Sequence, residues 1–589
     1  MLKIVSIFLG IAFFEILCYI LFFHHGITSN ISNLIVYKEY LNEYLILSLL
    51  FLLFFKKNKY TDILLYLLIA FVFIVDIAQF FSYYYSGAFL TITAFDNANQ
   101  FLLFANKYTI LVIMLVLIFY ILLIIYLNKI KIDNKKPAFI LLFVITFLNL
   151  YIYSQSHTKN IIIDKYSIEK GPIKSFVKVI IQYFEPITIT KVTLTKQEVD
   201  FAIQKKLIYD YNATYPMLKN FFYKHKLKDN NVTKKPNIIV FFVESFSAKY
   251  IDIYHQNNKS LITPNIDKLA KKGFFVKNYT NHTFPTIRGI YGQLCSLYPD
   301  FRVKSIVDNY NTYKFYNKKC LPSYLNEYGY NTIYFNHGNK KRQEIGRLAK
   351  SYGFKKMFFN LDLEKLLKEK PKASLDSDFS DQQISKAIIK YLKSYNKQQP
   401  FFIAVSTIET HIGYQLKNDA KTKKEFNDIE NSYYNLDDAL GKIFNFIEHS
   451  KYNNNTIIIV TGDHTRPMKV RKYHSTTYGD LALVIYSPFF KHKPFYANTS
   501  SISLAPTILH LINYPNKKNA FEGYSIFETN TNLAVGATLD NGLFYALYDK
   551  NNSVKSAEQF YKPNNKYSKY IYDIMHYIFM IHRENRLYK

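Results

Sequence analysis

The stretch of sequence that decides the fold is NIIVFFVES, residues 237–245. It is a short apolar run that ends abruptly in Glu244 and Ser245. From Lys235 onwards, such runs of Ile, Val and Phe alternate with helical stretches. This alternation is typical of a mostly parallel sheet covered by helices. We therefore predict that Asn237–Val243 is a strand of an α/β domain.

Three further runs share this character, and polar groups follow each of them. The predicted strands are Asn331–Phe335, which runs into Asn336-His337-Gly338-Asn339; Phe401–Ser406, which leads to Glu409-Thr410-His411; and Thr456–Val460, which ends in Thr461-Gly462-Asp463-His464. Ligands of open α/β sheets bind outside the carboxyl ends of the strands. A single His or Asp after a strand is usually a turn residue, but four strands that end this way predict a site at one edge of the sheet.

Two acids and a histidine from different strands suit a divalent cation with mixed oxygen and nitrogen ligands. Such an ion can polarise a phosphoryl oxygen. A hydroxyl nucleophile is available in NHTFPTIRG, residues 281–289, after the predicted helix Thr263–Lys272. A hydroxyl at a helix N-terminus faces backbone N–H groups that can hold phosphate. The alternative is that the threonine there only caps the helix.

Before this domain the sequence contains five apolar runs within residues 1–155. They are approximately Ile4–Phe23, Leu41–Phe55, Asp62–Phe81, Tyr108–Leu127 and Pro137–Tyr153. Most of them have close to the ~20 residues that cross a bilayer, and we predict a five-helix transmembrane domain. The alternative, buried helices of a soluble domain, must explain five such runs in succession.

Lysines in alternate loops predict how this domain is oriented. The charged loops contain Lys56, Lys57 and Lys59, and Lys129, Lys131, Lys135 and Lys136. Positively charged loops stay in the cytoplasm, so an odd number of spans puts everything after Tyr153 outside. In that oxidising compartment Cys295 and Cys320 could form one disulfide; two buried free thiols are the alternative.

Composition agrees with a large globular chain that has an anionic partner. The 589 residues are 49% hydrophobic, which excludes a disordered chain. Three cysteines exclude a dense disulfide scaffold and a multi-cysteine zinc module. The net charge of +30 suggests nucleic acid or the phosphates of a membrane surface. An outward-facing domain behind five spans favours the membrane, and we expect no nucleic-acid partner.

The motifs together resemble one family. They are NIIVFFVESFS (237–247), TPNIDKLA (263–270), TIRG (286–289), TGDH (461–464), SLAPTIL (503–509) and GYSIF (523–527). The set is similar to the lipoteichoic acid synthase-like sulfatase family, which lies within the alkaline phosphatase superfamily and includes phosphoglycerol transferases, with phosphoethanolamine transferases as close relatives. The resemblance implies a transmembrane domain (1–155) ahead of a sulfatase-like α/β domain with a mostly parallel central sheet (236–530). Between them, Ile168–Phe184 and Gln197–Lys226 have helical spacing with many lysines, and we predict an amphipathic linker (156–235) near the headgroups; a plain solvated helical linker is the alternative. Residues 531–589 would be a C-terminal extension.

The resemblance also implies roles for individual residues. One divalent ion (Mn, Mg or Zn) would be held by Glu244, Thr286, Asp463 and His464. Thr286 would be the nucleophile, with Thr283 as the fallback. Substrate binding would fall to His411, His337, His474 and Arg288. Gram-positive members carry a Trp and an Arg after the histidine that matches His337; this chain has no Trp, and Arg342 and Arg347 stand at shifted spacing.

The function that we expect is phosphoglycerol transfer by a multi-pass enzyme of the bacterial cytoplasmic (inner) membrane whose catalytic domain lies outside the cytoplasm. Thr286 would take the headgroup of a phospholipid donor, phosphatidylglycerol or phosphatidylethanolamine, and pass it to a glycan or glycolipid acceptor. The alternatives are phosphoethanolamine transfer to lipid A or a glycan, a metal-dependent phosphodiesterase or sulfatase-like hydrolase, and an inactive basic binding module. True sulfatases need Cys or Ser in a Cys/Ser-x-Pro-x-Arg motif, which TFPTI (283–287) lacks.

Overall fold

The structure of the chain is a computed structural model. It describes residues 191–220, 234–255, 261–300, 317–373, 378–411, 420–465, 480–515, 518–528, 531–537, 543–549, 554–560 and 565–588, with isolated positions elsewhere. The chain divides into two compact units, residues 1–185 with 469–474 and residues 186–468 with 475–589. The predicted spans of residues 1–155 lie almost wholly outside the described residues. Within the described part, no helix combines the length and the apolar character that crossing a bilayer requires.

The centre of the second unit is an eight-stranded sheet with the order β5-β4-β6-β2-β7-β8-β3-β9. Its strands are β2 (Asn237–Val243), β3 (Phe274–Thr280), β4 (Asn331–Asn336), β5 (Lys356–Phe358), β6 (Phe401–Ser406), β7 (Thr456–Gly462), β8 (Leu483–Tyr486) and β9 (Phe495–Ser500). The first five strands in this order are parallel, and only β8 runs antiparallel to its neighbours. The predicted mostly parallel sheet is confirmed.

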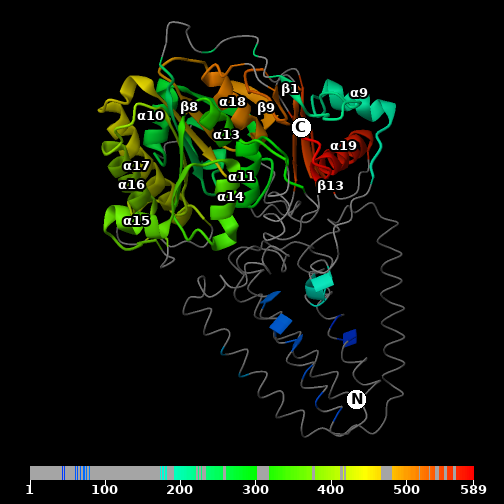
Figure 1. Cartoon of the computed structure of the whole chain (residues 1–589). Coiled ribbons are helices and arrows are strands. Elements are labelled where there is room, and N and C mark those ends of the chain that lie inside the picture. The colour runs from blue at the N-terminus through cyan, green and yellow to red at the C-terminus, as the bar shows by residue number, and fades with distance from the viewer. Residues whose placement is uncertain are drawn as a thin grey trace. The chain divides into compact units, whose positions relative to one another are not determined.

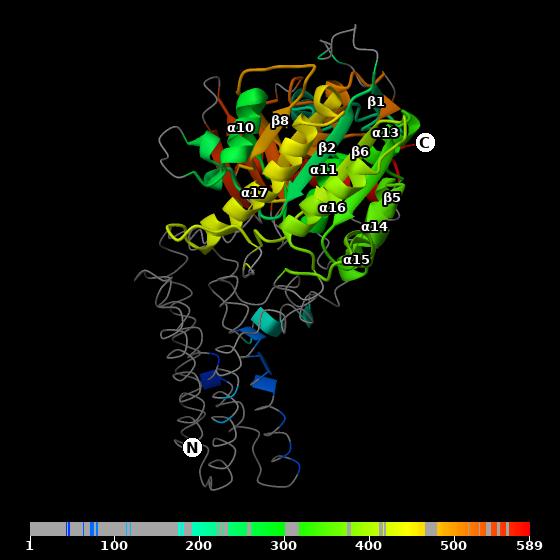
Figure 2. The same ribbon diagram turned by 90° about the vertical axis from the view of Figure 1, so that its left-hand side faces the viewer.

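Helices cover both faces of this sheet (Figures 1 and 2). One face is covered by α10 (Pro264–Lys272), α15 (Asn360–Leu367), α16 (Asp381–Lys393) and α17 (Asp428–Glu448). The other face is covered by α11 (Thr286–Cys295), α13 (Leu321–Glu327), α14 (Ile345–Tyr352) and α18 (Leu504–Leu511). Successive side chains of a strand point to opposite faces, and in β2 Ile239 joins one core while Val240 joins the other. A strand that is buried on both faces is apolar along its whole length. This explains the nearly continuous apolar run NIIVFFV in β2.

The predicted linker and C-terminal extension meet in the same unit. Helix α9 (Lys196–Gln204) packs beside α19 (Lys566–Arg583), with the rings of Phe201 and Tyr570 5.6 Å apart. The remaining strands are β1 (Lys219–Asn220) with β10 (Lys518–Asn519), and β11 (Leu533–Ala537), β12 (Leu543–Tyr548) and β13 (Val554–Phe560). In α19, Nε of Arg583 donates to Oδ2 of Asp300 at 3.0 Å. The extension is therefore tied to the loop that follows α11.

One predicted helix is much shorter than its pattern. Helical spacing extends over residues 197–226, but α9 ends at Gln204. Lys206 takes a positive φ of 55°, and the backbone N–H groups of Tyr209 and Asp210 bond to the carbonyl of Pro216 in a compact turn. A left-handed residue ends a helix, and apolar spacing alone does not reveal it.

Candidate active site and metal centre

The four predicted strand ends lie at one edge of the sheet. Strands β4, β6, β2 and β7 are adjacent and parallel. Their register pairs Asn336 with Ser406, Ser406 with Phe242, and Val243 with Gly462. All four strands therefore end at the same edge of the sheet. This edge carries His337, the loop Thr407–His411, Glu244, and Asp463 with His464.

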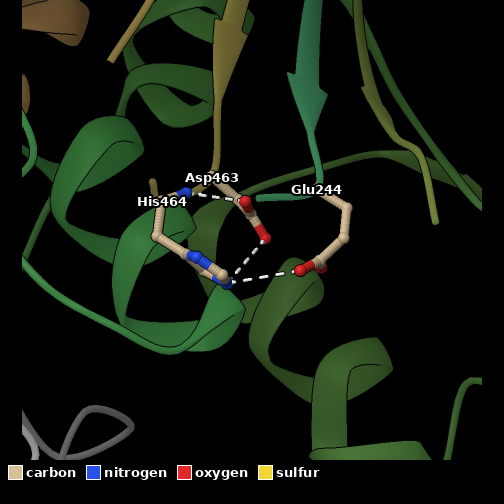
Figure 3. A group of neighbouring side chains, drawn as sticks. All are labelled: Glu244, Asp463 and His464. Carbon is tan, nitrogen blue, oxygen red and sulfur yellow. Dashed lines mark hydrogen bonds and ion pairs between the residues drawn. The ribbon is translucent and has the colours of Figure 1, made fainter. Parts of the chain in front are cut away.

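Three of these side chains converge into one cluster. Ligand atoms of Glu244, Asp463 and His464 all lie within 4.8 Å of one another, and all three residues are buried. Nε2 of His464 is 3.4 Å from Oε1 of Glu244 and 3.6 Å from Oδ2 of Asp463 (Figure 3). Nδ1 of His464 lies 2.8 Å from the carbonyl oxygen of Thr465. That carbonyl can only accept, so Nδ1 carries the proton and the lone pair of Nε2 faces the two carboxylates.

The backbones of the two loops are joined beneath the cluster. The N–H of Asp463 donates to the carbonyl of Val243, and the N–H of Phe246 donates to the carbonyl of His464. Between them, Ser245 takes a φ of 52°, donates its N–H to Oδ1 of Asp463 at 3.0 Å and its hydroxyl to Oε1 of Glu244 at 2.7 Å. A non-glycine residue in the left-handed region is a strain that the surrounding contacts must hold. Ser245 is thus part of the site, although its sequence position alone suggested no role.

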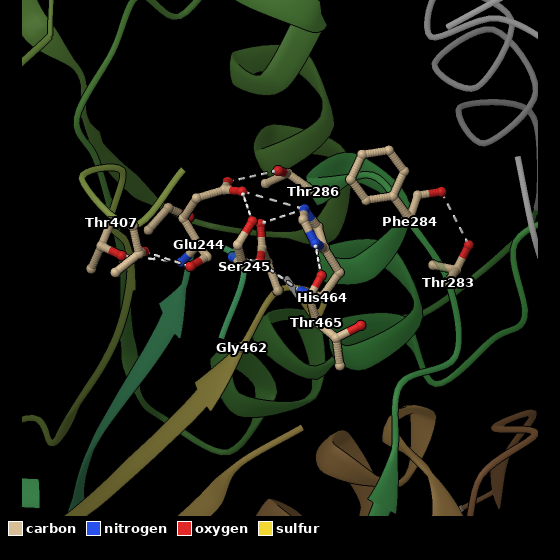
Figure 4. Close-up of polar contacts among 12 residues, drawn as sticks. Glu244, Ser245, Thr283, Phe284, Thr286, Thr407, Gly462, His464 and Thr465 are labelled. Carbon is tan, nitrogen blue, oxygen red and sulfur yellow. Dashed lines mark hydrogen bonds and ion pairs between the residues drawn. The ribbon is translucent and has the colours of Figure 1, made fainter. Parts of the chain in front are cut away.

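Thr286 is the first residue of α11, and its hydroxyl donates to Oε2 of Glu244 at 3.1 Å (Figure 4). Helix α11 approaches the end of β7 very closely. A Cβ on Gly289 would lie 2.0 Å from the carbonyl oxygen of Asp463, so only glycine fits there. Nε2 of Gln293 also donates to the carbonyl of Gly462 at 2.7 Å. The TIRG glycine therefore brings the predicted nucleophile to the carboxylates.

The pKa values of the two carboxyl groups in this cluster are shifted in opposite directions. Burial by itself raises the pKa of Glu244, but its contacts with the two histidines His464 and His411 and its hydrogen bonds with Ser245 and Asp463 outweigh burial and hold this pKa at about 2. Burial, together with the charge of Glu244, raises the pKa of Asp463 well above its usual range. Burial lowers the pKa of His464. Two neighbouring buried carboxylates repel each other when both are charged, and a bound cation would offset this repulsion.

The residues fit a divalent cation. Oδ2 of Asp463 is buried without a hydrogen-bond partner among the described residues, although a buried carboxylate oxygen normally has one. The carboxylates, the imidazole Nε2 and the hydroxyl of Thr286 form a mixed oxygen and nitrogen set. Glu244, Asp463 and His464 lie close enough together to hold the ion, and Thr286 as a fourth ligand stays a prediction.

The other predicted site residues differ in their surroundings. His411 follows Thr410, whose hydroxyl donates to the carbonyl of Glu244. Arg288 is buried, and its Nη2 donates to the carbonyl of Asp300 at 2.8 Å. Thr283 is buried, and its hydroxyl donates to the carbonyl of Phe284 at 3.3 Å. Thr286, and not Thr283, bonds to the cluster.

His474 lies outside the described residues. Cys295, the last residue of α11, forms a disulfide bond with Cys320. This is the pairing that their predicted compartment suggested.

The part of the chain that contains this site is similar to known proteins. Residues 236–514 match the family model described as Sulfatase. The chain is similar to lipoteichoic acid synthase 1 of Bacillus subtilis (strain 168), at 25% identity over 350 residues, which are 53% of this chain and 51% of the relative. The chain thus spans about half the length of that curated relative.

Two solved structures are similar to this chain. A protein in the alkaline phosphatase superfamily from Vibrio parahaemolyticus superimposes with a TM-score of 0.54 at 17% identity, over 67% of this chain and 98% of that chain. The lipoteichoic acid synthase LtaP from Listeria monocytogenes gives a TM-score of 0.49 at 14% identity, over 62% of this chain and 96% of that chain. Residues 236–514 therefore match the Sulfatase family model, and the chain shares its α/β fold with the Vibrio parahaemolyticus protein of the alkaline phosphatase superfamily.

Proposed function

We propose that this protein is a membrane-anchored, metal-dependent transferase. It moves the phosphoglycerol headgroup of phosphatidylglycerol to a hydroxyl group of a glycan or glycolipid of the cell envelope. The observation that carries the proposal is the hydrogen bond from the hydroxyl of Thr286 to Glu244, inside a cluster whose ligand atoms suit a divalent cation. The similarity to a lipoteichoic acid synthase supports the choice of a transferase.

Thr286 attacks the phosphorus of the donor lipid in the first step. A bond forms between its Oγ1 and phosphorus, the bond from phosphorus to the diacylglycerol oxygen breaks, and that oxygen takes a proton. In the second step an acceptor hydroxyl attacks the phosphothreonine, and Oγ1 leaves and regains its proton. Covalent catalysis of this kind divides one difficult displacement into two easier ones.

The chain's own groups orient and stabilise this reaction. Glu244 accepts the hydrogen bond of Thr286 and so directs Oγ1. The first N–H groups of α11 are the donors that a helix N-terminus offers to phosphate oxygens. When bound, a divalent cation lowers the pKa of the nucleophile's hydroxyl and offsets charge on the phosphoryl group. His411, held beside Glu244 by its neighbour Thr410, would contact the phosphate.

Membrane anchoring by residues 1–155, with the catalytic domain outside the cytoplasm, is part of the same proposal. It is supported by the five apolar runs and by the lysines of alternate loops. A donor that is a lipid requires a site close to a bilayer, and the net charge of +30 favours anionic headgroups.

Product analysis with the full chain tests the function. The chain is placed in vesicles that contain phosphatidylglycerol labelled in its headgroup and a diacylglycerol-linked disaccharide as acceptor. We expect release of diacylglycerol and a labelled disaccharide lipid. Free glycerol phosphate without a labelled lipid would show a hydrolase, and transfer only from phosphatidylethanolamine would show the other headgroup. Thr286→Val serves as the control that keeps the side-chain shape.

A further inference from the structure

A second group of polar side chains lies at the same edge of the sheet, beyond β4. His337 follows this strand directly. Oδ2 of Asp378 accepts a 2.7 Å bond from Nη1 of Arg342 and lies 3.6 Å from Nδ1 of His337. The side chain of Asp378 has no exposed surface, whereas those of His337 and Arg342 are 11% and 21% exposed. A fully buried carboxylate thus supports two side chains that reach the surface.

The backbone around His337 is shaped to bring Asp378 close. The N–H of Phe379 donates to the carbonyl of His337 at 3.0 Å. A Cβ on Gly338 would lie 2.9 Å from Oδ1 of Asp378 and 3.2 Å from Nη1 of Arg342. Glycine at this position is therefore what allows the carboxylate and the guanidinium to lie against the chain beside His337.

Asp378 is held in its charged form. Burial raises the pKa of Asp378, but the contact with His337 and the charge and hydrogen bond of Arg342 outweigh burial and hold it well below its usual range. A carboxylate opposite one ring nitrogen of a histidine favours the tautomer with the proton on that nitrogen. Although 3.6 Å is longer than a hydrogen bond, such contacts often tighten only when substrate binds.

The position of His337 suits a part of the substrate that lies beyond the phosphorus. Strand β4 is two strands away from β2, and neighbouring strands are about 4.8 Å apart, so the end of β4 is about 10 Å from the end of β2. Residues 378–381 connect the two strand ends, because the N–H of Phe379 donates to the carbonyl of His337 and Oδ1 of Asp381 accepts from the N–H of Ile408, in the loop after β6, at 3.0 Å.

We propose that Asp378 is a positioning residue that holds His337 with its proton on Nδ1, so that Nε2 can accept a hydrogen bond from a hydroxyl group of the headgroup or acceptor. Arg342 fixes the orientation of the carboxylate. This inference rests on the proposed function for the identity of the substrate, but the geometry of the three residues does not.

The tautomer of His337 tests this role without any catalysis. The full chain is prepared in detergent with 15N-labelled histidine, and His337→Gln identifies the His337 signals by their loss. In the wild-type chain at pH 8 we expect the signature of a proton on Nδ1. In Asp378→Asn we expect this signature to shift toward a proton on Nε2 or a mixture. An unchanged His337 signal in Asp378→Asn would overturn the proposal.

Activity then separates positioning from general stability. We expect His337→Gln and Asp378→Asn each to lower the rate of diacylglycerol release by about 10²-fold. If Asp378 acts through His337, Asp378→Asn in the His337→Gln background should cost less than about twofold more, because effects of residues that act together are not additive. Full additivity would contradict the role.

Asp437→Asn is the matched control. Asp437 is another fully buried carboxylate, and it accepts from the N–H groups of Asn265 and Ile266 at the start of α10. The loss in the rate of diacylglycerol release caused by Asp437→Asn should be the same in the wild-type chain and in the His337→Gln variant. If the wild-type chain releases no diacylglycerol, the proposed function fails, whereas the histidine spectrum still decides the role of Asp378.

Discussion

The hydroxyl of Thr286 donates a hydrogen bond of 3.1 Å to Oε2 of Glu244, across 42 positions of sequence. Thr286 begins α11, and Glu244 follows β2 directly. A threonine that only caps its helix would direct its hydroxyl to a backbone N–H of the first turn. In α11 the cap position is Pro285, which makes no side-chain hydrogen bond, so Thr286 is the first helical residue and not the cap. The bond to Glu244 therefore favours the nucleophile over the cap.

Loss of this hydroxyl should abolish transfer. We expect Thr286→Val to lower the rate of diacylglycerol release by at least about 10³-fold, because removing a covalent nucleophile leaves only binding and electrostatic effects. Thr286→Ser, which keeps a hydroxyl, should retain part of the activity. The rates are measured on the full chain in phosphatidylglycerol vesicles. Near wild-type activity of Thr286→Val would contradict the assignment.

Metal binding should depend on Asp463. A divalent ion at 100 times its Kd stabilises a folded protein by about 2.7 kcal/mol, so adding Mn, Mg or Zn after chelation should raise the unfolding temperature. Asp463→Asn should lose this rise. Without metal it should be no less stable than the wild-type chain, since it removes a carboxylate buried beside the charge of Glu244. Scanning calorimetry measures both effects, and an equal rise in Asp463→Asn would show that the ion binds elsewhere.

The close approach of α11 to β7 predicts a steric effect at Gly289. A methyl group there meets the carbonyl of Asp463 at 2.0 Å, so Gly289→Ala must displace the helix that carries Thr286. We expect transfer to fall by about 10²-fold, since small displacements of reacting groups have effects of this size. Gly346→Ala, in α14, is the control for a helical glycine with a tight contact, at 2.9 Å from a backbone oxygen. Equal losses in the two variants would argue against the positional effect.

The buried histidine before the nucleophile loop predicts a loss of stability in acid. Nδ1 of His282 lies 2.6 Å from the hydroxyl of Ser501, and burial lowers the pKa of His282 to about 3 from 6.5. Between these pH values the unfolded chain binds more protons than the folded one. The free energy of unfolding should therefore fall as pH drops from 6.5, by up to about 1.4 kcal/mol per pH unit.

His282→Asn should flatten this dependence, measured by urea unfolding between pH 7 and pH 4. His449→Asn provides the control, because His449 is exposed at the end of α17. A slope in His282→Asn as steep as that of the wild-type chain would assign the acid loss to other groups.

Much of the site was predictable because strand ends can be recognised locally. Asn237–Val243 and Phe401–Ser406 are strands with the predicted bounds. Each is an apolar run that stops at a polar group, and parallel strands deliver such groups to one edge. This rule predicted Glu244, Asp463 and His464 as metal ligands, and the structure brings these three side chains together.

The rest depends on contacts that sequence spacing does not encode. Strand β9 (Phe495–Ser500) is largely polar and was not predicted as a strand; it exists because β3 pairs with it. Ser245 bonds to Asp463, and Arg342 bonds to Asp378. Only the fold brings the two residues of each pair together. His337 was predicted from its motif, whereas its buried partner Asp378, 41 positions later, had no local signal.

The most direct test of the central claim is the mass of Thr286 after exposure to lipid. The full chain is incubated with phosphatidylglycerol without acceptor, digested, and the peptide that contains residues 283–289 is measured by mass spectrometry. The account predicts a phosphoglycerol ester on Thr286 that disappears when the disaccharide lipid is added. An unmodified Thr286 in a preparation that does release diacylglycerol, or an ester on Thr283 instead, would contradict it.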